Sequence, residues 1–268
     1  MRISRPALTL FAVRGVVAAS SLAFFPAAAL AIEDRADIEP NEPVGVDRGI
    51  AWKLTPSAYR ETAGRSAIDL NLRGNRENDT FWIGQYQRGA EFQQMRAGYE
   101  RQFTLPAGRV IASGQYASGG FWGGSITLEA SSAATGPYVG LLGLGRTNRK
   151  PYYNLNFDPN DSVLIGAGWR PDEGAALTLF QVRDDRLGTK QRVTHLVLRR
   201  KTGARSRWTV DVFERSGRSD ADPGSESFKA NGLALTYDRE PWFVRLAWDP
   251  KVNYTNSDMT RLAIGTRF

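Results

Sequence analysis

The sequence predicts an all-β protein whose strands form an antiparallel transmembrane β-barrel. Three features point to this fold class: an N-terminal leader for export, a series of short segments in which apolar and polar residues alternate, and a last segment that ends in an aromatic residue. Strand side chains point alternately to two faces, so a sheet with one lipid-facing side shows a period of two. Each alternating segment is weak evidence alone, and the prediction depends on their sum.

Residues 1–31 have the layout of a secretory signal peptide. Arg2 and Arg5 form a basic start, residues 15–25 form a short apolar core, and an A-x-A cleavage site ends at Ala31. Serines interrupt the apolar core and a proline follows it, which favours cleavage over the alternative of an uncleaved membrane anchor. We therefore expect export, with a mature chain that begins at Ile32.

Composition narrows the class of protein further. The full chain of 268 residues has a formal net charge of +7, and loss of Arg2, Arg5 and Arg14 with the leader lowers it to about +4. The charges are scattered, which argues against a nucleic-acid-binding surface. The chain has no cysteine, so disulfides and thiolate metal sites are excluded. Beyond the leader no segment has the ~18 apolar residues of a membrane helix, so any crossing would use strands.

Successive strands are expected after an acidic, proline-containing stretch. Residues 32–49 predict a flexible periplasmic segment ahead of a barrel over residues 50–268. Alternating runs bounded by turn residues predict strands at residues 50–59, 68–73, 81–86, 95–103, 110–116, 122–130, 138–146, 163–169, 175–182, 192–199, 208–213, 232–237, 242–248 and 259–268. The first run is the least regular, because Pro56 cannot donate a ladder hydrogen bond.

These runs give about fourteen strands when residues 50–59 are included, and twelve is the alternative, because bacterial single-chain barrels have even strand numbers.

Connection lengths support the assignment. Counted back from the C-terminus, they alternate between long and short across the second half of the chain, as external loops and periplasmic turns would. The connection at residues 74–79 departs from this alternation, since it falls on the periplasmic side without being shorter than nearby outer turns.

The last run, residues 259–268, carries the sharpest motif. Leu262, Ile264 and Phe268 lie on one face of the expected strand, and Arg261 and Arg267 lie on the other. The run resembles the closing strand of Gram-negative bacterial outer-membrane β-barrels, which alternates in this way and ends in phenylalanine. The resemblance matches no particular subfamily.

That resemblance has implications for location and partners. It implies an outer-membrane location and contact with outer-membrane lipid. It also implies that Phe268 acts as a membrane-insertion signal, read by the barrel-assembly machinery.

Aromatic residues provide a second test of the barrel. Many are expected on outward faces near strand ends, where barrels place interfacial girdles. The expected outward set is Trp82, Tyr86, Tyr99, Phe103, Trp122, Trp169, Trp208, Tyr237, Trp242, Trp248 and Phe268. A soluble β-sandwich is the alternative, because its aromatic-rich core gives the same alternation. Export, the terminal strand and the loop alternation favour the barrel.

The opposite faces predict a polar, mixed-charge lumen. The lumen-facing candidates are Arg73, Arg96, Glu100, Glu129, Asp211, Arg245, Arg261 and Arg267, together with Asp69, Asn71, Gln102 and Ser125. Opposed cations and carboxylates in a water-filled lumen would sort solutes by charge, which predicts a passive, porin-like channel for small hydrophilic solutes. The same groups could instead pair and plug the barrel, leaving a structural or surface-binding protein whose working parts are the loops at residues 147–161 and 216–227.

An enzymatic function would require a catalytic group. His195 is the single histidine. Outer-membrane phospholipases resemble this chain in export and barrel class, but Val197 stands where their motif has serine. We expect His195 to be a strand residue hydrogen-bonded to a neighbour, and we expect no catalytic residue, metal or cofactor. A membrane-embedded lipid hydrolase is the less favoured alternative.

Overall fold

The computed structural model describes residues 49–62, 64–131, 138–148, 150, 152, 163–184, 189–218, 224–252 and 256–268. The predicted signal peptide, residues 1–31, and all of residues 32–49 except Gly49 lie outside the described residues. Within the described residues, no helix is long and apolar enough to cross a membrane.

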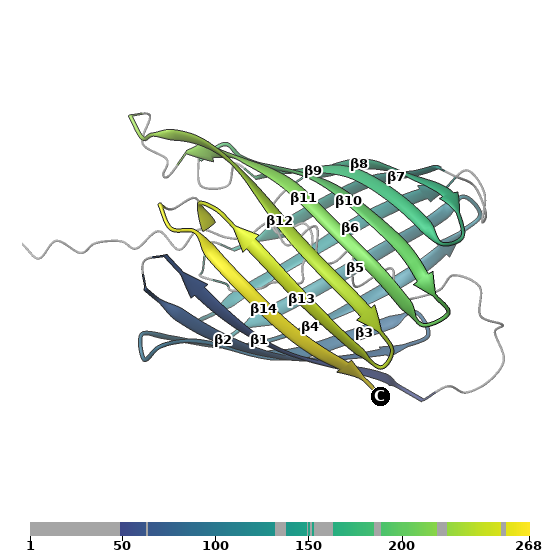
Figure 1. Ribbon diagram of the computed structural model, residues 1–268, viewed down its shortest axis with the longest axis horizontal. Coiled ribbons are helices and arrows are strands. Elements are labelled where there is room, and N and C mark those ends of the chain that lie inside the picture. Colours follow the sequence, from purple (N-terminus) through teal and green to yellow (C-terminus); the bar gives the residue numbers. More distant parts are fainter. Residues whose placement is uncertain are drawn as a thin grey trace, which may run out of the picture.

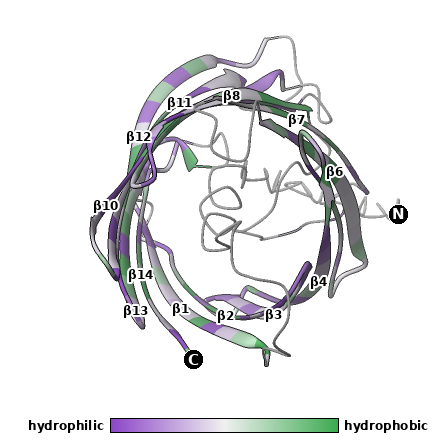
Figure 2. Ribbon diagram, turned by 90° about the vertical axis from the view of Figure 1, so that its right-hand side faces the viewer, coloured by the Kyte–Doolittle hydropathy of each residue, from purple (hydrophilic) through white to green (hydrophobic). Residues whose placement is uncertain are grey.

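Fourteen strands form one closed antiparallel barrel, in which each strand pairs with its neighbours in sequence and β1 closes on β14 (Figures 1 and 2). The strands are β1 (Ala51–Glu61), β2 (Ser66–Arg76), β3 (Asp79–Arg88), β4 (Phe92–Leu105), β5 (Gly108–Ala117), β6 (Phe121–Ser131), β7 (Tyr138–Thr147), β8 (Val163–Asp172), β9 (Ala175–Asp184), β10 (Gln191–Gly203), β11 (Ser206–Arg218), β12 (Ser227–Arg239), β13 (Trp242–Asp249) and β14 (Met259–Arg267). The prediction of fourteen strands is confirmed, and the alternative of twelve is wrong.

The connections differ in length between the two ends of the barrel. We call the end where β1 begins and β14 stops the terminal end. Five of the six turns there have two residues, at 77–78, 106–107, 173–174, 204–205 and 240–241, whereas the connection between β6 and β7 has six. The connections at the opposite end have three or more residues. Residues 74–79, which broke the expected alternation, are mostly strand around the short turn at Glu77 and Asn78. In the first half of the chain the alternation holds from β1 to β6 and breaks at the connection between β6 and β7.

Pro56 is accommodated inside β1 without a change of register. On the β2 side it lies opposite Leu70 in an unbroken ladder. On the β14 side the pairing is interrupted after Leu54–Thr266 and resumes in the same register at Ser57–Ala263. The missing N–H of proline accounts for this local gap.

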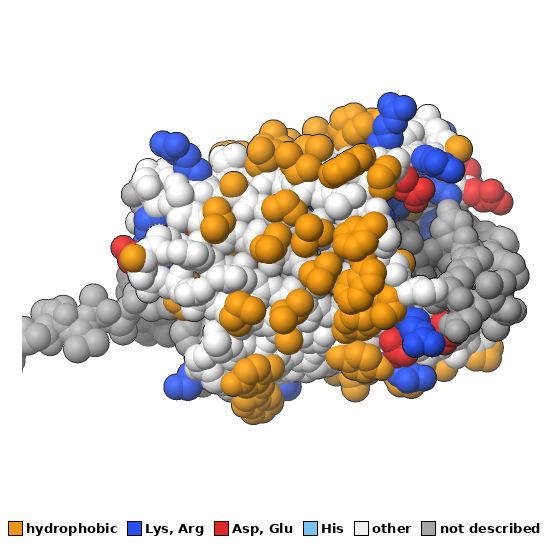
Figure 3. Space-filling model, turned by 90° about the horizontal axis from the view of Figure 1, so that it is seen from below, with side chains coloured by type: hydrophobic (Ala, Val, Ile, Leu, Met, Phe, Trp, Pro, Cys, Tyr) orange, Lys and Arg blue, Asp and Glu red, His pale blue; other side chains and the backbone are white. Residues whose placement is uncertain are grey.

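The outer surface of the barrel is apolar around its middle. Figure 3 shows apolar side chains across the middle of one face and basic side chains toward its two ends. Exposed outward residues include Ile68, Leu70, Ile83, Trp122, Ile126, Leu144, Ile165, Trp169, Leu179, Trp242, Leu246, Trp248 and Ile264. A β-sandwich would bury such residues between its sheets. A closed barrel that exposes them has the lipid-facing belt of a transmembrane protein.

Two aromatic residues lie on the face opposite to the one expected. Trp82 and Tyr86 of β3 were expected to face outward, but both are buried inside the barrel while Ile83 is exposed. Both faces of β3 carry large apolar residues, so hydrophobicity alone does not set which face points to lipid. Tyr86 packs edge-on against Tyr59 and Phe92, and these contacts fix the inward orientation of this face.

Trp82 belongs to a set of inward aromatic rings that lie flat across glycines. In β3–β4, β11–β12 and β13–β14, an inward aromatic residue is the register partner of a glycine on the next strand: Trp82 with Gly98, Phe213 with Gly232, and Phe243 with Gly265. A methyl group built on any of these glycines would overlap the facing ring. Each ring therefore lies along the wall of the barrel, where it occupies less of the lumen.

Replacing Gly98 with alanine tests this packing. We expect Gly98→Ala to destabilise the barrel by about 1–3 kcal/mol, because the Trp82 indole must leave its position on the wall. The matched control is Gly114→Ala, since a methyl group at Gly114 meets no atom within 4 Å. Denaturant unfolding of the two variants in detergent would check the difference, and equal stability would contradict it.

Candidate functional site

The candidate site is the interior of the barrel. Side chains along each strand point alternately outward and inward, and many of the inward ones are polar. Buried positions hold Arg73, Arg96, Glu100, Glu129, Asp211, Arg245 and Arg261, and Arg267 near the terminal end is partly buried. They come from β2, β4, β6, β11, β13 and β14, so no single segment of sequence forms the site. Three arrangements of these groups can be distinguished: paired charges, a surplus of cations, and an apolar wall.

The paired charges bridge neighbouring or nearby strands. The Arg96 guanidinium donates to Asp69 Oδ1 at 2.5 Å, with both side chains almost wholly enclosed. Arg109 donates to Glu129 at 2.5 Å and to Gln102 at 2.9 Å. Arg215 lies 2.9 Å from Asp249. Charge-assisted pairs of this kind neutralise one another in a weakly solvated interior, so they brace the wall.

Asp238 holds two arginines near the terminal end. Its carboxylate accepts from Arg267 Nη2 at 2.7 Å and from Arg207 Nη2 at 3.2 Å. Arg207 is the direct register partner of Asp238 across β11 and β12. One carboxylate thus fixes two guanidinium groups that come from β11 and β14.

A cavity beside this carboxylate contains more cations than anions. Six cationic side chains line it, against two carboxylates, those of Asp69 and Asp238. We call the six residues the basic cluster: Lys53, Arg73, Arg207, Arg245, Arg261 and Arg267. The cavity volume is about 40 Å³. That is room for about three waters at ~10–15 Å³ each.

Strand register brings three members of the basic cluster side by side. Lys53 of β1 lies opposite Arg267 of β14 on one side and opposite Arg73 of β2 on the other. The Phe243 ring lies beneath two of these cations, with Lys53 Nζ at 4.5 Å and Arg267 Cζ at 5.2 Å from its centroid. Cation–π attraction to this ring holds both side chains in place.

Arg245 and Arg261 form the deeper part of the basic cluster. They are 8% and 7% exposed. Arg245 pairs in register with Ala263, two residues from Arg261, so the two arginines are diagonal neighbours on β13 and β14. Arg261 also lies over the Tyr59 ring at 5.6 Å. These two arginines continue the positive surface from the terminal end toward the middle of the lumen.

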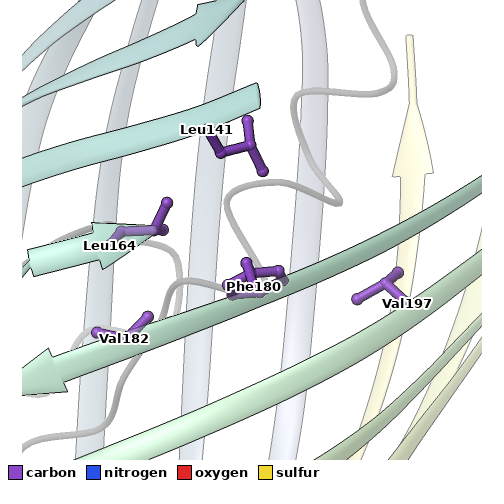
Figure 4. Close-up of a cluster of buried hydrophobic side chains, with 5 residues drawn as sticks. All are labelled: Leu141, Leu164, Phe180, Val182 and Val197. Atoms are coloured by element: carbon purple, nitrogen blue, oxygen red, sulfur yellow. The ribbon is translucent and has the colours of Figure 1, made fainter. Parts of the chain in front are cut away.

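The opposite wall of the lumen is apolar. Leu141, Leu164, Phe180, Val182 and Val197 form a buried cluster on β7, β8, β9 and β10 (Figure 4). Because most of the buried polar side chains lie on β1–β6 and β10–β14, a hydrated path would run beside those strands rather than beside β7–β9.

Residues from two connections at the end opposite the terminal end also pack inside. Tyr152, from the connection between β7 and β8, stacks on Phe121 at 3.9 Å and donates its hydroxyl to Gln115 Oε1 at 2.6 Å. Val252, from the connection between β13 and β14, packs with Tyr59 and Met259. The loop at residues 147–161 was expected to be external, and most of it lies outside the described residues, but Tyr152 is buried.

His195 lies on a strand and is hydrogen-bonded to a neighbouring side chain, as expected. Its Nδ1 lies 3.0 Å from Asp211 Oδ1, and its ring stacks on Phe180 at 4.7 Å. The side chain is 4% exposed and faces the lumen. Among the described residues, no hydroxyl group is hydrogen-bonded to the other ring nitrogen. The prediction of a strand histidine hydrogen-bonded to a neighbour is confirmed.

Possible metal ligands do not cluster in the part of the chain that the structure describes. There, no group of three or more His, Cys, Asp or Glu side chains is placed to hold a metal ion.

Comparison with solved structures supports the fold. The chain resembles the outer membrane protein Omp33 of Acinetobacter baumannii, with a TM-score of 0.52 at 9% identity over 82% of this chain and 98% of that chain. Weaker similarities are to the NanC porin (TM-score 0.45, 8% identity, 80% of this chain and 100% of that chain) and a mutant of the Rh. blastica porin (0.46, 10%, 82% and 99%). At these identities the likeness establishes the fold alone. No protein-family model and no curated protein matches the chain.

Sequence reasoning did not find several residues of the site. Lys53 and Arg207 were not proposed as lumen-facing, because Lys53 lies in the least regular predicted strand, residues 50–59, and Arg207 lies just outside the predicted strand of residues 208–213. Phe243 follows the outward-facing Trp242, so alternation predicts that it points inward, but its position beneath two cations depends on the β13–β14 and β14–β1 register. Tyr152 and Val252 belong to connections, which have no periodic signal.

The Arg96–Asp69 pair gives a test of how strongly the interior is enclosed. We expect Asp69→Asn to lower the free energy of unfolding by about 3 kcal/mol, because it leaves a buried guanidinium without its carboxylate. Asp172→Asn, which removes an exposed carboxylate 2.7 Å from Arg200, should cost no more than about 1 kcal/mol. Denaturant titration in detergent would measure both, and a small effect at Asp69 would indicate a well-hydrated pair.

Proposed function

We propose that the protein is a porin-like outer-membrane channel through which small hydrophilic solutes pass passively. The observation that carries this proposal is the charged, water-accessible cavity enclosed by a barrel whose outside is apolar. A lumen lined by ionised groups favours hydrated solutes over apolar ones. The lumen-facing candidates would form the solute-facing surface: Arg73, Arg96, Glu100, Glu129, Asp211, Arg245, Arg261 and Arg267. The fold likeness to Omp33 is consistent with this proposal.

The proposal includes a route to the membrane. Residues 1–31 would direct export and be removed after Ala31, residues 32–49 would remain periplasmic, and the terminal end of the barrel would face the periplasm. Outer-membrane lipid would surround the apolar belt. The barrel-assembly machinery would bind the C-terminal strand through Phe268, whose side chain is 68% exposed.

A plugged barrel is the second candidate. It is favoured by the apolar wall on β7–β10 and by Tyr152 and Val252, which occupy space inside the barrel. A lipid hydrolase has less support, because His195 faces the lumen rather than the lipid and stacks on Phe180. The channel and the plugged barrel differ in whether a continuous hydrated path exists beside the basic cluster.

Single-channel recording decides between a channel and a plugged barrel. We expect the full chain, produced with its own leader and purified from membranes, to give discrete conductance steps in a planar bilayer, because the polar side of the lumen would conduct ions. Only material that migrates differently on a gel before and after boiling should be used, since that shift reports a folded barrel. Folded protein that never conducts would contradict the channel.

The proposed role of Phe268 can be separated from stability. The Phe268 backbone is held by two hydrogen bonds with Trp52, of 2.9 and 3.0 Å, whereas its side chain projects from the wall. Phe268→Ala should therefore reduce the amount of barrel in the outer membrane several-fold while changing unfolding free energy by less than about 0.5 kcal/mol. Outer-membrane yield and denaturant unfolding would be measured together. Unchanged yield would contradict the role as an insertion signal.

A further inference from the structure

We infer that the basic cluster binds and selects small anions carrying carboxylate or phosphate groups. This inference rests on the proposed channel function and names the class of solute. It depends on three features of the basic cluster: the crowding of like charges, the engagement of the nearby carboxylates, and the geometry of the arginines.

Like charges are crowded in two places. Arg267, Lys53 and Arg73 are consecutive register partners on β14, β1 and β2, and like charges directly opposite across a sheet repel. Arg245 and Arg261 are diagonal neighbours on the inward faces of β13 and β14, and both are buried. Both arrangements bring several positive charges to one wall of the cavity, where the oxygens of a bound anion could contact more than one of them.

The two carboxylates of the cavity already carry arginine partners. Asp69 accepts from Arg96, which comes from outside the cavity lining, and Asp238 accepts from Arg207 and Arg267. Neither carboxylate therefore offers an unengaged negative charge to a passing cation. The field in the cavity is set by the cations, and it should exclude cationic solutes while concentrating anions.

The geometry of the cluster suits oxyanions in particular. Five of the six cations are arginines, whose planar fork pairs with two oxygens of a carboxylate or phosphate. Asp238 and the Phe243 ring hold Arg267 in place, so the site is partly organised before a ligand arrives. The lining also includes Thr55, Asn71, Thr209 and Thr236, whose side chains can hydrogen-bond the hydroxyl groups of an organic anion.

Reversal potentials test the selectivity. The full chain is recorded in a planar bilayer under a KCl gradient, and we expect chloride to be favoured over potassium several-fold. Arg245→Gln/Arg261→Gln should bring the permeability ratio close to one. Absence of conductance would defeat the proposed channel itself. Conductance with a cation preference, or an unchanged ratio in the double variant, would leave the channel intact and overturn the anion site.

The matched control removes the same charge from the outer surface. Arg101 and Arg200 face outward, with side chains 53% and 57% exposed, so Arg101→Gln/Arg200→Gln has the same net charge as the lumenal variant. We expect this control to keep the wild-type permeability ratio. An equal loss of selectivity in the control would show that net charge is responsible, which would overturn the assignment to the basic cluster.

A binding measurement tests the site without any conductance. Citrate or inorganic phosphate at millimolar concentration should raise the temperature at which the folded gel band converts to the unfolded one, relative to chloride at equal ionic strength. Arg245→Lys/Arg261→Lys keeps the charge but loses the fork, so it should retain anion selectivity while the citrate shift shrinks. Absence of any shift in the wild-type protein would overturn binding, even where the glutamine variant does not fold.

Discussion

Closure of the hydrogen-bond ladder is the constraint on which the rest of the structure depends. A strand edge exposed to hydrocarbon would leave its backbone N–H and C=O groups without partners, at a cost of several kcal/mol each. Here β1 meets β14, and Trp52 and Phe268 exchange backbone hydrogen bonds at the terminal end. Once the ladder is closed, the pleat alone decides which residues face lipid and which face the interior. Every polar group on an inward position must then find its partners across the lumen.

The charged side chains of the interior are arranged in two different ways. Around Arg96, Arg109 and Arg215, each guanidinium lies against a carboxylate, and such pairs brace the wall without giving the lumen a net sign. Around Lys53 and Arg245, cations gather beside other cations and are held partly by aromatic rings. The first arrangement is typical of a structural interior. The second creates a positive electrostatic potential in the lumen. Both occur on the same strands, because β11 and β13 carry the Arg215–Asp249 pair as well as Arg207 and Arg245.

Much of this architecture could be predicted from the sequence, and the failures have physical causes. Alternation of apolar and polar residues predicted the strand number and most of the inward faces. β3 was placed with the wrong face outward, because Phe81 and Ile83 are as apolar as Trp82 and Tyr86. The basic cluster could not be predicted as a unit, since the neighbours of Lys53 follow from register across β14 and β2. Lumenal residues from connections, such as Tyr152, have no periodic signature at all.

The pairing of Phe243 with Gly265 links backbone sequence to electrostatics. Gly265 has no side chain, yet its bare backbone is the surface on which the Phe243 ring lies, and that ring in turn positions Lys53 and Arg267. The location of two positive charges is therefore encoded partly by an uncharged residue on a neighbouring strand. Drift in the permeability of such barrels during evolution need not involve any change of charge, because the acquisition of one methyl group beneath a ring can move the cations above it.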